Sequence, residues 1–193
     1  APPMRRESLN NLRPQTLEAV LQRLGFSAAP ATDLTGLTAL YRSWCRSVPF
    51  DNTLKLIALH GPQSGPLPGT DAESFFESWL GHGTGGTCWP SNNALSSLMR
   101  ACGFRSRMVA ASMADTGVAS HGTTIVTLDV GDWLIDSSML TDAPLQLSTQ
   151  TATSIDHTVF TTSAQPVPEG WLLQFSLPYA TATMPITGIR HSS

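Results

Sequence analysis

The spacing of apolar residues changes at Gly103, and this change constrains the fold class more than any other feature. Before Gly103, apolar residues recur at i, i+3, i+4 and i+7, beginning with the run from Leu17 to Leu24. That spacing is typical of one helix face. After Gly103, short β-favouring runs alternate with turn residues, which is typical of strands. We therefore predict an α+β protein, with a helical domain over residues 1–103 and a β-rich domain over residues 104–193.

The predicted helices follow from this periodicity and from residues that begin or end helices. Pro49 ends the second helix, because the residue before a proline avoids helical backbone, and Asp71 is a suitable N-cap for the third. Four glycines within residues 81–86 separate the third helix from the fourth, which ends at Gly103. The predicted spans are residues 14–24, 34–47, a segment after Asp71 that carries Phe75, Phe76 and Trp79, and 89–101. Prolines and glycines between Leu59 and Asp71 predict a loop.

Strands are predicted where β-branched and aromatic residues form short runs between turn residues. The three clearest runs are residues 108–113, 123–128 and 133–135, and further β structure is expected at residues 158–161 and 171–177. Gly131-Asp132 has the composition of a two-residue hairpin loop. We therefore expect residues 123–130 to run antiparallel to residues 133–135.

Charge and cysteine content exclude several classes of function. The net charge of -3 and the scattered basic residues leave no stripe that could neutralise a phosphate backbone, so no nucleic-acid partner is expected. Apolar runs such as residues 54–59 are far shorter than the roughly 18 to 20 residues that span a bilayer, so we expect no membrane association and a cytoplasmic location. The cysteines at 45, 88 and 102 lack metal-binding spacing, and we expect reduced thiols without a metal site.

Cys88 is the candidate nucleophile, because a Gly-rich segment leads from Gly83 directly to this residue at the start of a predicted helix. The positive end of the helix dipole and the unpaired N–H groups there favour a thiolate. The thiolate is the reactive form, and nearby backbone amides could form an oxyanion hole. The alternative is that Cys88 is a small buried hydrophobic residue, as many lone cysteines are.

His121 is the candidate base and Asp136 the candidate acid that orients it. His121 precedes one predicted strand and Asp136 follows its hairpin partner, so both can meet at the same edge of the sheet. We choose Asp136 over the nearby Asp129 and Asp132 because the residues before it are apolar and would hold it rigidly. His82 is a rival base, but it lies in a loop that gives it no scaffold. Together with Cys88 these residues have the order of a catalytic triad.

Several motifs together make the sequence resemble the arylamine N-acetyltransferase family. These are Arg46-Ser47-Val48-Pro49-Phe50-Asp51-Asn52, Gly85-Gly86-Thr87-Cys88 with Asn92 downstream, His121, and the segment 130–136. The resemblance covers roughly two thirds of the chain in order and spacing. It implies a helical bundle that carries the cysteine, an antiparallel β-barrel-like domain that carries histidine and aspartate, and a C-terminal α/β lid. The core would be cysteine-protease-like (transglutaminase-like).

The resemblance also implies an activity. Family members move an acetyl group from acetyl-coenzyme A to the cysteine and then to an aromatic amine, with no permanently bound cofactor. Similar enzymes form amides from carrier-bound polyketides. The expected substrate-binding residues are Phe50, Gly86, Thr87 and Trp89, and Asp51 and Asn52 are further candidates. The small-molecule partners would be an amine acceptor and an acyl thioester donor.

The sequence departs from the family around the nucleophile. Thr84 and Thr87 replace the usual arginine and aromatic residue on either side of the two glycines, and Trp89-Pro90 replaces Phe-Glu. The Gly-rich segment after the aspartate is here residues 137–140, Ser-Ser-Met-Leu. The chain is also shorter than a typical member, so we expect a reduced or absent lid. Three functions remain open: an acetyltransferase, an amide synthase or biosynthetic acyltransferase that uses a bulkier or carrier-protein-bound donor, and a noncatalytic interaction protein that keeps the scaffold.

Overall fold

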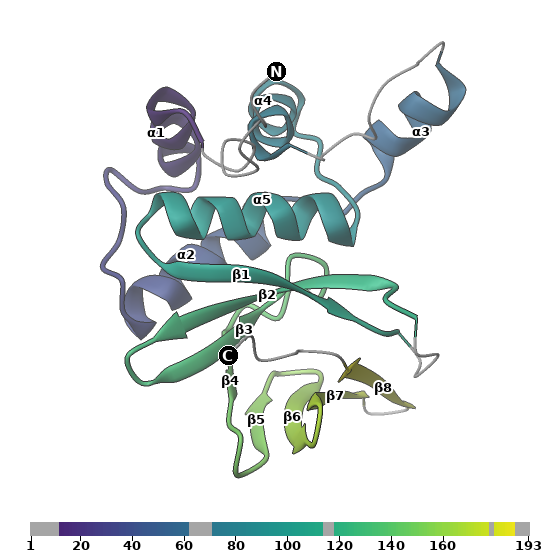
Figure 1. Ribbon diagram of the computed structural model, residues 1–193. Helices are drawn as coiled ribbons and strands as arrows, with labels where there is room; N and C mark the ends of the chain where they lie inside the picture. Colours follow the sequence, from purple (N-terminus) through teal and green to yellow (C-terminus); the bar gives the residue numbers. More distant parts are fainter. Residues whose placement is uncertain (1–11, 62–70, 114–117, 178–179, 188–193) are drawn as a thin grey trace, which may run out of the picture.

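The computed structural model describes residues 12–61, 71–113, 118–177 and 180–187. In this part of the chain, every helix precedes Cys102 and every strand follows it (Figure 1). The helices are α1 (Pro14–Arg23), α2 (Leu34–Ser47), α3 (Thr53–His60), α4 (Ala72–His82) and α5 (Cys88–Ala101). The strands are β1 (Arg105–Ala111), β2 (His121–Leu128), β3 (Gly131–Ile135), β4 (Leu145–Leu147), β5 (Thr153–Asp156), β6 (Thr161–Val167), β7 (Gly170–Leu177) and β8 (Ala180–Thr187). The predicted α+β class is confirmed, whereas the division into two domains at residue 103 stays a prediction.

Local signals explain where the helices begin and end. The Asp71 carboxylate accepts hydrogen bonds from the N–H groups of Glu73 and Ser74 at the start of α4, which satisfies donors that have no partner within the helix. The same helix ends at Gly83, whose φ of 72° lies in the left-handed region that favours glycine. Helix α2 ends at Ser47, two residues before Pro49, as predicted.

The strands form two open antiparallel sheets, with the orders β1-β2-β3-β4 and β5-β6-β7-β8. The expected barrel is therefore not closed. Within the described residues, each outer strand pairs with one neighbour only; for example, β4 pairs with β3 alone and β5 with β6 alone.

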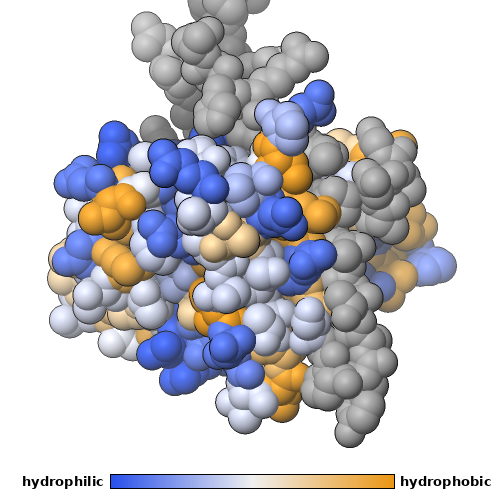
Figure 2. Space-filling view, turned by 90° about the horizontal axis from the view of Figure 1, so that it is seen from below, coloured by the Kyte–Doolittle hydropathy of each residue, from blue (hydrophilic) through white to orange (hydrophobic). Residues whose placement is uncertain are grey.

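On the face shown in Figure 2, hydrophobic side chains lie in scattered patches among hydrophilic ones wherever grey atoms do not cover the surface.

Strand β2 lies between two hydrophobic cores, and almost all of its residues are buried. Val126 faces the helices, where it joins a core that includes Trp44, Phe76 and Trp79. Its neighbour Ile125 faces the second sheet and packs in a separate cluster. Side chains alternate between the two faces of a strand, so consecutive residues of β2 serve different cores. Figure 1 shows the same layers, with α5 over the first sheet and the second sheet below it.

One helix was missed and two predictions about local elements were wrong. Helix α3 buries none of its side chains. It was missed because its sequence therefore lacks the one-sided apolar pattern that predicts a helix. The hairpin loop is residues 129–130 rather than Gly131-Asp132, because Gly131 pairs with Leu128 and Asp132 with Thr127. Residues 158–160 connect β5 to β6 instead of forming a strand, and β6 begins only at Thr161.

The aromatic core should dominate stability. Phe76 is fully buried and its ring packs edge-on against Trp44, Phe75 and Trp79, so Phe76→Ala should lower the free energy of unfolding by about 3–5 kcal/mol. Ile57 on α3 is 58% exposed, and Ile57→Ala should change it by less than about 0.5 kcal/mol. Urea unfolding followed by tryptophan fluorescence measures both. Equal losses in the two variants would contradict this account of the core.

Candidate active site

Cys88 is the first residue of α5, as the Gly-rich sequence before it suggested. The segment before Cys88 is held by residues 50–51 of the same chain. The Gly85 N–H donates to Asp51 Oδ2 at 2.7 Å, and Phe50 and Gly86 form a parallel β-bridge. A Cβ atom at Gly85 would lie 1.7 Å from the Pro49 carbonyl oxygen, so this close approach requires glycine. Asp51 thus fixes the loop that leads into the helix, and its expected place in the pocket stays a prediction.

His121 and Asp136 meet at one end of adjacent strands. In the β2–β3 register, Thr124 lies opposite Ile135, and extending this register by one residue places Thr123 opposite Asp136. His121 lies two residues from Thr123, so it shares the same face of the sheet. Its Nε2 and Asp136 Oδ2 are 2.7 Å apart, with both side chains buried. The hairpin thus brings the two predicted residues together even though its loop lies two residues from the predicted one.

The Asp136 carboxylate is held by its own turn. Its Oδ1 accepts hydrogen bonds from the Ser138 N–H at 2.8 Å, from the Ser138 hydroxyl at 2.6 Å and from the Met139 N–H at 3.2 Å. Burial works to raise its pKa, but the hydrogen bond and charge of His121, with help from Ser138 and Thr123, lower the pKa below its usual value. Asp136 is therefore ionised at neutral pH.

The surroundings of Cys88 favour a thiolate. The hydrogen-bonded His121 imidazole lowers the pKa of Cys88 most, burial opposes it, and the N–H groups of Gly122 and Trp89 lower it further. For His121, burial would lower the pKa, but the hydrogen bonds and charges of Asp136 and Cys88 outweigh it and raise the pKa to about 9. The two shifts have the same physical effect, because each favours the ion pair of thiolate and imidazolium.

The competing residues lie elsewhere. Asp129 is exposed and lies 3.6 Å from an Arg105 nitrogen. Asp132 lies 3.7 Å from an Arg107 nitrogen and accepts a hydrogen bond from Thr127. His82 is the exposed last residue of α4. Of the predicted acids, the structure therefore places Asp136 on the imidazole.

Asn92 connects the three residues, although the sequence singled it out only as part of the family resemblance. It is fully buried one helical turn after Cys88. Its Nδ2 lies 3.1 Å from the Cys88 carbonyl oxygen, 2.6 Å from that of Gly122 and 3.4 Å from Asp136 Oδ1. Its Oδ1 accepts the N–H of Ser137 at 3.2 Å. A single amide thus ties α5 to both strands that carry the site.

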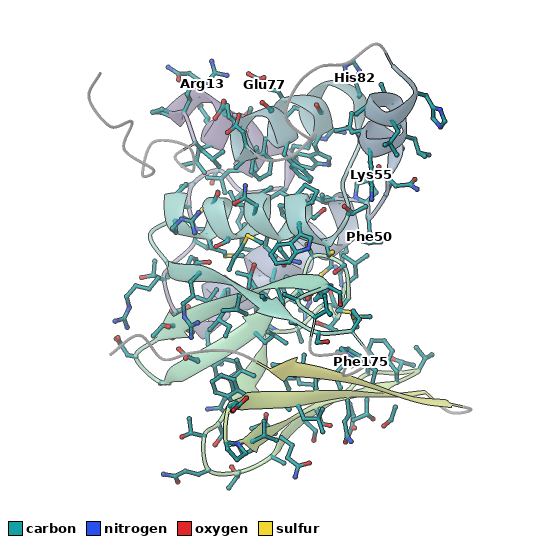
Figure 3. All side chains as sticks on the ribbon, turned by 45° about the vertical axis from the view of Figure 1, so that its right-hand side comes forward. Arg13, Phe50, Lys55, Glu77, His82 and Phe175 are labelled. Atoms are coloured by element: carbon teal, nitrogen blue, oxygen red, sulfur yellow. The ribbon has the colours of Figure 1, made fainter. Side chains whose placement is uncertain are left out.

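Of the four predicted substrate-binding residues, Gly86, Thr87 and Trp89 lie within two residues of Cys88 in the chain, and Phe50 is bridged to Gly86. Phe50 is 47% exposed and Trp89 is 42% exposed, whereas Gly86 is buried and Thr87 is the half-buried N-cap of α5. In Figure 3, Phe50 lies at the level where the helices meet the first sheet. The Trp89 ring packs on β2 so closely that a Cβ at Gly122 would lie 2.7 Å from it. Two partly exposed aromatic residues therefore flank the segment that carries the thiol: Phe50 is bridged to Gly86, and Trp89 follows Cys88 in the chain.

Two other kinds of site have no candidate within the described residues. No group of three or more His, Cys, Asp or Glu side chains there could hold a metal ion. No described helix is long and apolar enough to cross a membrane.

Comparison with known proteins identifies the family. A family model described as N-acetyltransferase matches residues 33–179, which is more than half of the chain. The chain belongs to the arylamine N-acetyltransferase family. The resemblance stated from the motifs around Phe50, Cys88 and His121 is confirmed.

Solved arylamine N-acetyltransferases share the fold at low sequence identity. The chain is similar to the Salmonella typhimurium enzyme at 19% identity, with a TM-score of 0.75 over 95% of this chain and 66% of that one. It is also similar to the Mycobacterium marinum enzyme in complex with CoA, at 22% identity and a TM-score of 0.73, over 92% of this chain and 66% of that one.

A curated relative has a different name. Proansamycin X synthase of Amycolatopsis mediterranei is 28% identical over 126 residues, which are 62% of this chain and 46% of that protein. The chain therefore spans less than half of this relative and less than two thirds of the two solved structures. The predicted reduction of the lid stays a prediction.

Cys88 should be the fastest thiol to react. Burial raises the pKa values of Cys45 and Cys102 to about 11, so their thiolates form only well above neutral pH, whereas the lowered pKa of Cys88 keeps its thiolate present there. Limiting iodoacetamide at pH 7, followed by peptide mapping, should label Cys88 first. Raising the pH towards 11 should accelerate the other two cysteines far more than Cys88. Earlier labelling of Cys45 or Cys102 at pH 7 would refute the assignment of the reactive thiol.

Proposed function

We propose that the protein is an N-acyltransferase that carries its acyl group as a thioester on Cys88, with His121 as the base and Asp136 as the orienting acid. The observation that carries this proposal is the buried His121–Asp136 contact of 2.7 Å next to a thiol whose pKa is lowered mainly by the same imidazole. Family membership supports the reaction class.

The first half-reaction loads the cysteine. Because His121 Nε2 is bound to Asp136, the other ring nitrogen, Nδ1, takes the Cys88 proton. The thiolate then attacks the carbonyl carbon of an acyl thioester, the bond from that carbon to the donor sulfur breaks, and the donor thiol leaves with the proton from His121. Asp136 stabilises the imidazolium formed in between.

The second half-reaction releases the product. An amine nitrogen attacks the Cys88 thioester, an amide bond forms and the carbon–sulfur bond breaks. His121 accepts the proton that the amine loses and shares it with the departing Cys88 sulfur, which restores the starting pair of residues. The N–H groups of Gly122 and Trp89, which favour the thiolate, are the donors that we assign to the oxyanion of either tetrahedral intermediate.

Acetyl-coenzyme A is the proposed donor and an aromatic amine the proposed acceptor. A solved relative contains CoA, which supports this class of donor. Phe50 and Trp89 offer partly exposed aromatic surface on the segments that flank Cys88, against which an aromatic acceptor could stack. Gly86 and Thr87 complete the proposed substrate-binding set as the backbone that leads to Cys88.

Incubation with acetyl-coenzyme A should add one acetyl group to Cys88, detected by intact-mass spectrometry. Cys88→Ala should remove the adduct, and Cys45→Ala should keep it. Asp136→Asn should lower the acylation rate by roughly 10²–10⁴-fold, because the amide no longer stabilises imidazolium. An adduct on another cysteine, or full activity in Asp136→Asn, would contradict the mechanism.

A second candidate function is an amide-forming synthase whose donor is bulkier than acetyl-coenzyme A. The similarity to a protein named as a synthase favours it, as do the unusual residues around the nucleophile, Thr84, Thr87 and Trp89-Pro90. Transfer to the thiolate needs the same three residues in both cases, whereas the choice of donor depends on contacts with the rest of the thioester. A carrier-protein-bound donor is one form of this candidate.

A panel of acyl thioesters separates the candidates. If the protein is a specialised synthase, kcat/KM for Cys88 acylation should rise from acetyl-coenzyme A to longer or carrier-bound donors. Acetylation of a simple aniline at about 10⁴ M⁻¹s⁻¹ or above would instead favour the acetyltransferase. No adduct with any donor, while iodoacetamide still labels Cys88 rapidly, would favour the noncatalytic alternative.

A further inference from the structure

The buried hydroxyl of Tyr41 on α2 is bound to the turn that follows Asp136. Tyr41 is 0% exposed. Its hydroxyl donates to the Asp136 carbonyl oxygen at 2.9 Å and accepts from the Asp136 N–H at 3.2 Å and the Thr141 N–H at 3.3 Å. The Thr141 hydroxyl lies 2.9 Å away. One phenol therefore binds both ends of the turn over residues 136–141.

This turn has a backbone that needs support. Leu140 and Asp142 have φ angles of 49° and 63°, in the left-handed region that side chains other than glycine rarely adopt. No glycine stands between Asp136 and Asp142 to relieve this conformation. Such a backbone persists only where its surroundings hold it.

Part of the support comes from α2. Through Asp136, Met139 and Thr141, the turn also lines a small cavity with side chains of both sheets such as Leu134 and Phe175. Arg42 and Arg46 reach Asp142, the residue after the turn, at 3.2 Å and 3.6 Å from its Oδ2, but these side chains are 47% and 69% exposed. Exposed ion pairs contribute little, so the buried hydroxyl of Tyr41 is the main polar anchor from α2, alongside the Asn92 amide of α5 that accepts the Ser137 N–H.

We propose that Tyr41 is a positioning residue for the active site, and that its hydroxyl fixes the Asp136 carboxylate on His121 by holding both ends of the 136–141 turn. The inference rests on the proposed roles of Cys88, His121 and Asp136. Tyr41 touches none of the reacting atoms. It acts through the backbone of Asp136 on His121 and Cys88. The other titratable group at its hydroxyl is the Cys45 thiol on the same helix, whose pKa burial raises to about 11. The charged groups beside the turn are Asp142, Arg42 and Arg46.

Tyr41→Phe tests the proposal, because it removes the hydroxyl and keeps the buried ring. The measurement is the rate of Cys88 alkylation by iodoacetamide across pH 5–9, with thermal unfolding as a check on folding. A displaced Asp136 stabilises imidazolium less, so the midpoint of the pH profile should rise by about 0.5–1 unit. The rate below the midpoint should then fall about three- to tenfold.

Ser43→Ala is the matched control, because it also removes a hydroxyl from α2, one that binds the Leu24 carbonyl oxygen rather than the turn. It should leave the pH profile unchanged. Tyr41 is merely structural, and the proposal is overturned, if Tyr41→Phe lowers the unfolding temperature but its pH profile of Cys88 alkylation has the same midpoint as that of Ser43→Ala.

Thr141→Val decides the question if Tyr41→Phe does not fold. It removes one partner of the phenol and should shift the midpoint in the same direction by less; no shift would overturn the proposal. Alkylation uses no acyl donor. A failure here therefore concerns Tyr41 alone, whereas the absence of any acyl adduct on the wild-type protein would count against the proposed function.

Discussion

A carboxylate buried at Asp136 is the constraint on which the rest of the site depends. A buried charge is tolerated only where paired and hydrogen-bonded groups replace water. Here the replacements come from separate parts of the chain: His121 on β2, Ser138 and Met139 in the following turn, and Asn92 on α5. Satisfying one side chain therefore fixes a helix, a strand and a turn relative to one another, and Cys88 lies at the start of that same helix.

Strand β2 explains why this arrangement is rigid. It begins at His121 and is buried on both faces, against the helices through Val126 and against the second sheet through Ile125. A displacement of the histidine would have to disturb two cores at once, and close-packed cores resist such shifts. The site thus takes its precision from the best-packed strand of the first sheet, while its aromatic neighbours Phe50 and Trp89 remain partly exposed.

Short-range signals predicted much of the fold, and long-range contacts account for most of what was missed. Asp71 and Pro49 bounded their helices correctly because capping and proline geometry are local. Asp136 was chosen over its neighbours because apolar residues precede it, and the hydrogen-bonded partner of His121 is indeed Asp136. The hairpin loop was misplaced because its position depends on cross-strand pairing at Gly131. The part that Tyr41 plays was also out of reach, since a tyrosine on a buried helix face reveals that its hydroxyl needs a partner but not which partner 95 positions away.

The contact between Trp89 and Gly122 couples the side chains that the two positions can carry together. With the indole in this position, a Cβ atom at position 122 would lie 2.7 Å from the ring, so the ring would have to move to admit any side chain there. A smaller residue at position 89 would remove this contact and leave room at position 122. A side chain at position 122 therefore requires either a displaced indole or the loss of the tryptophan.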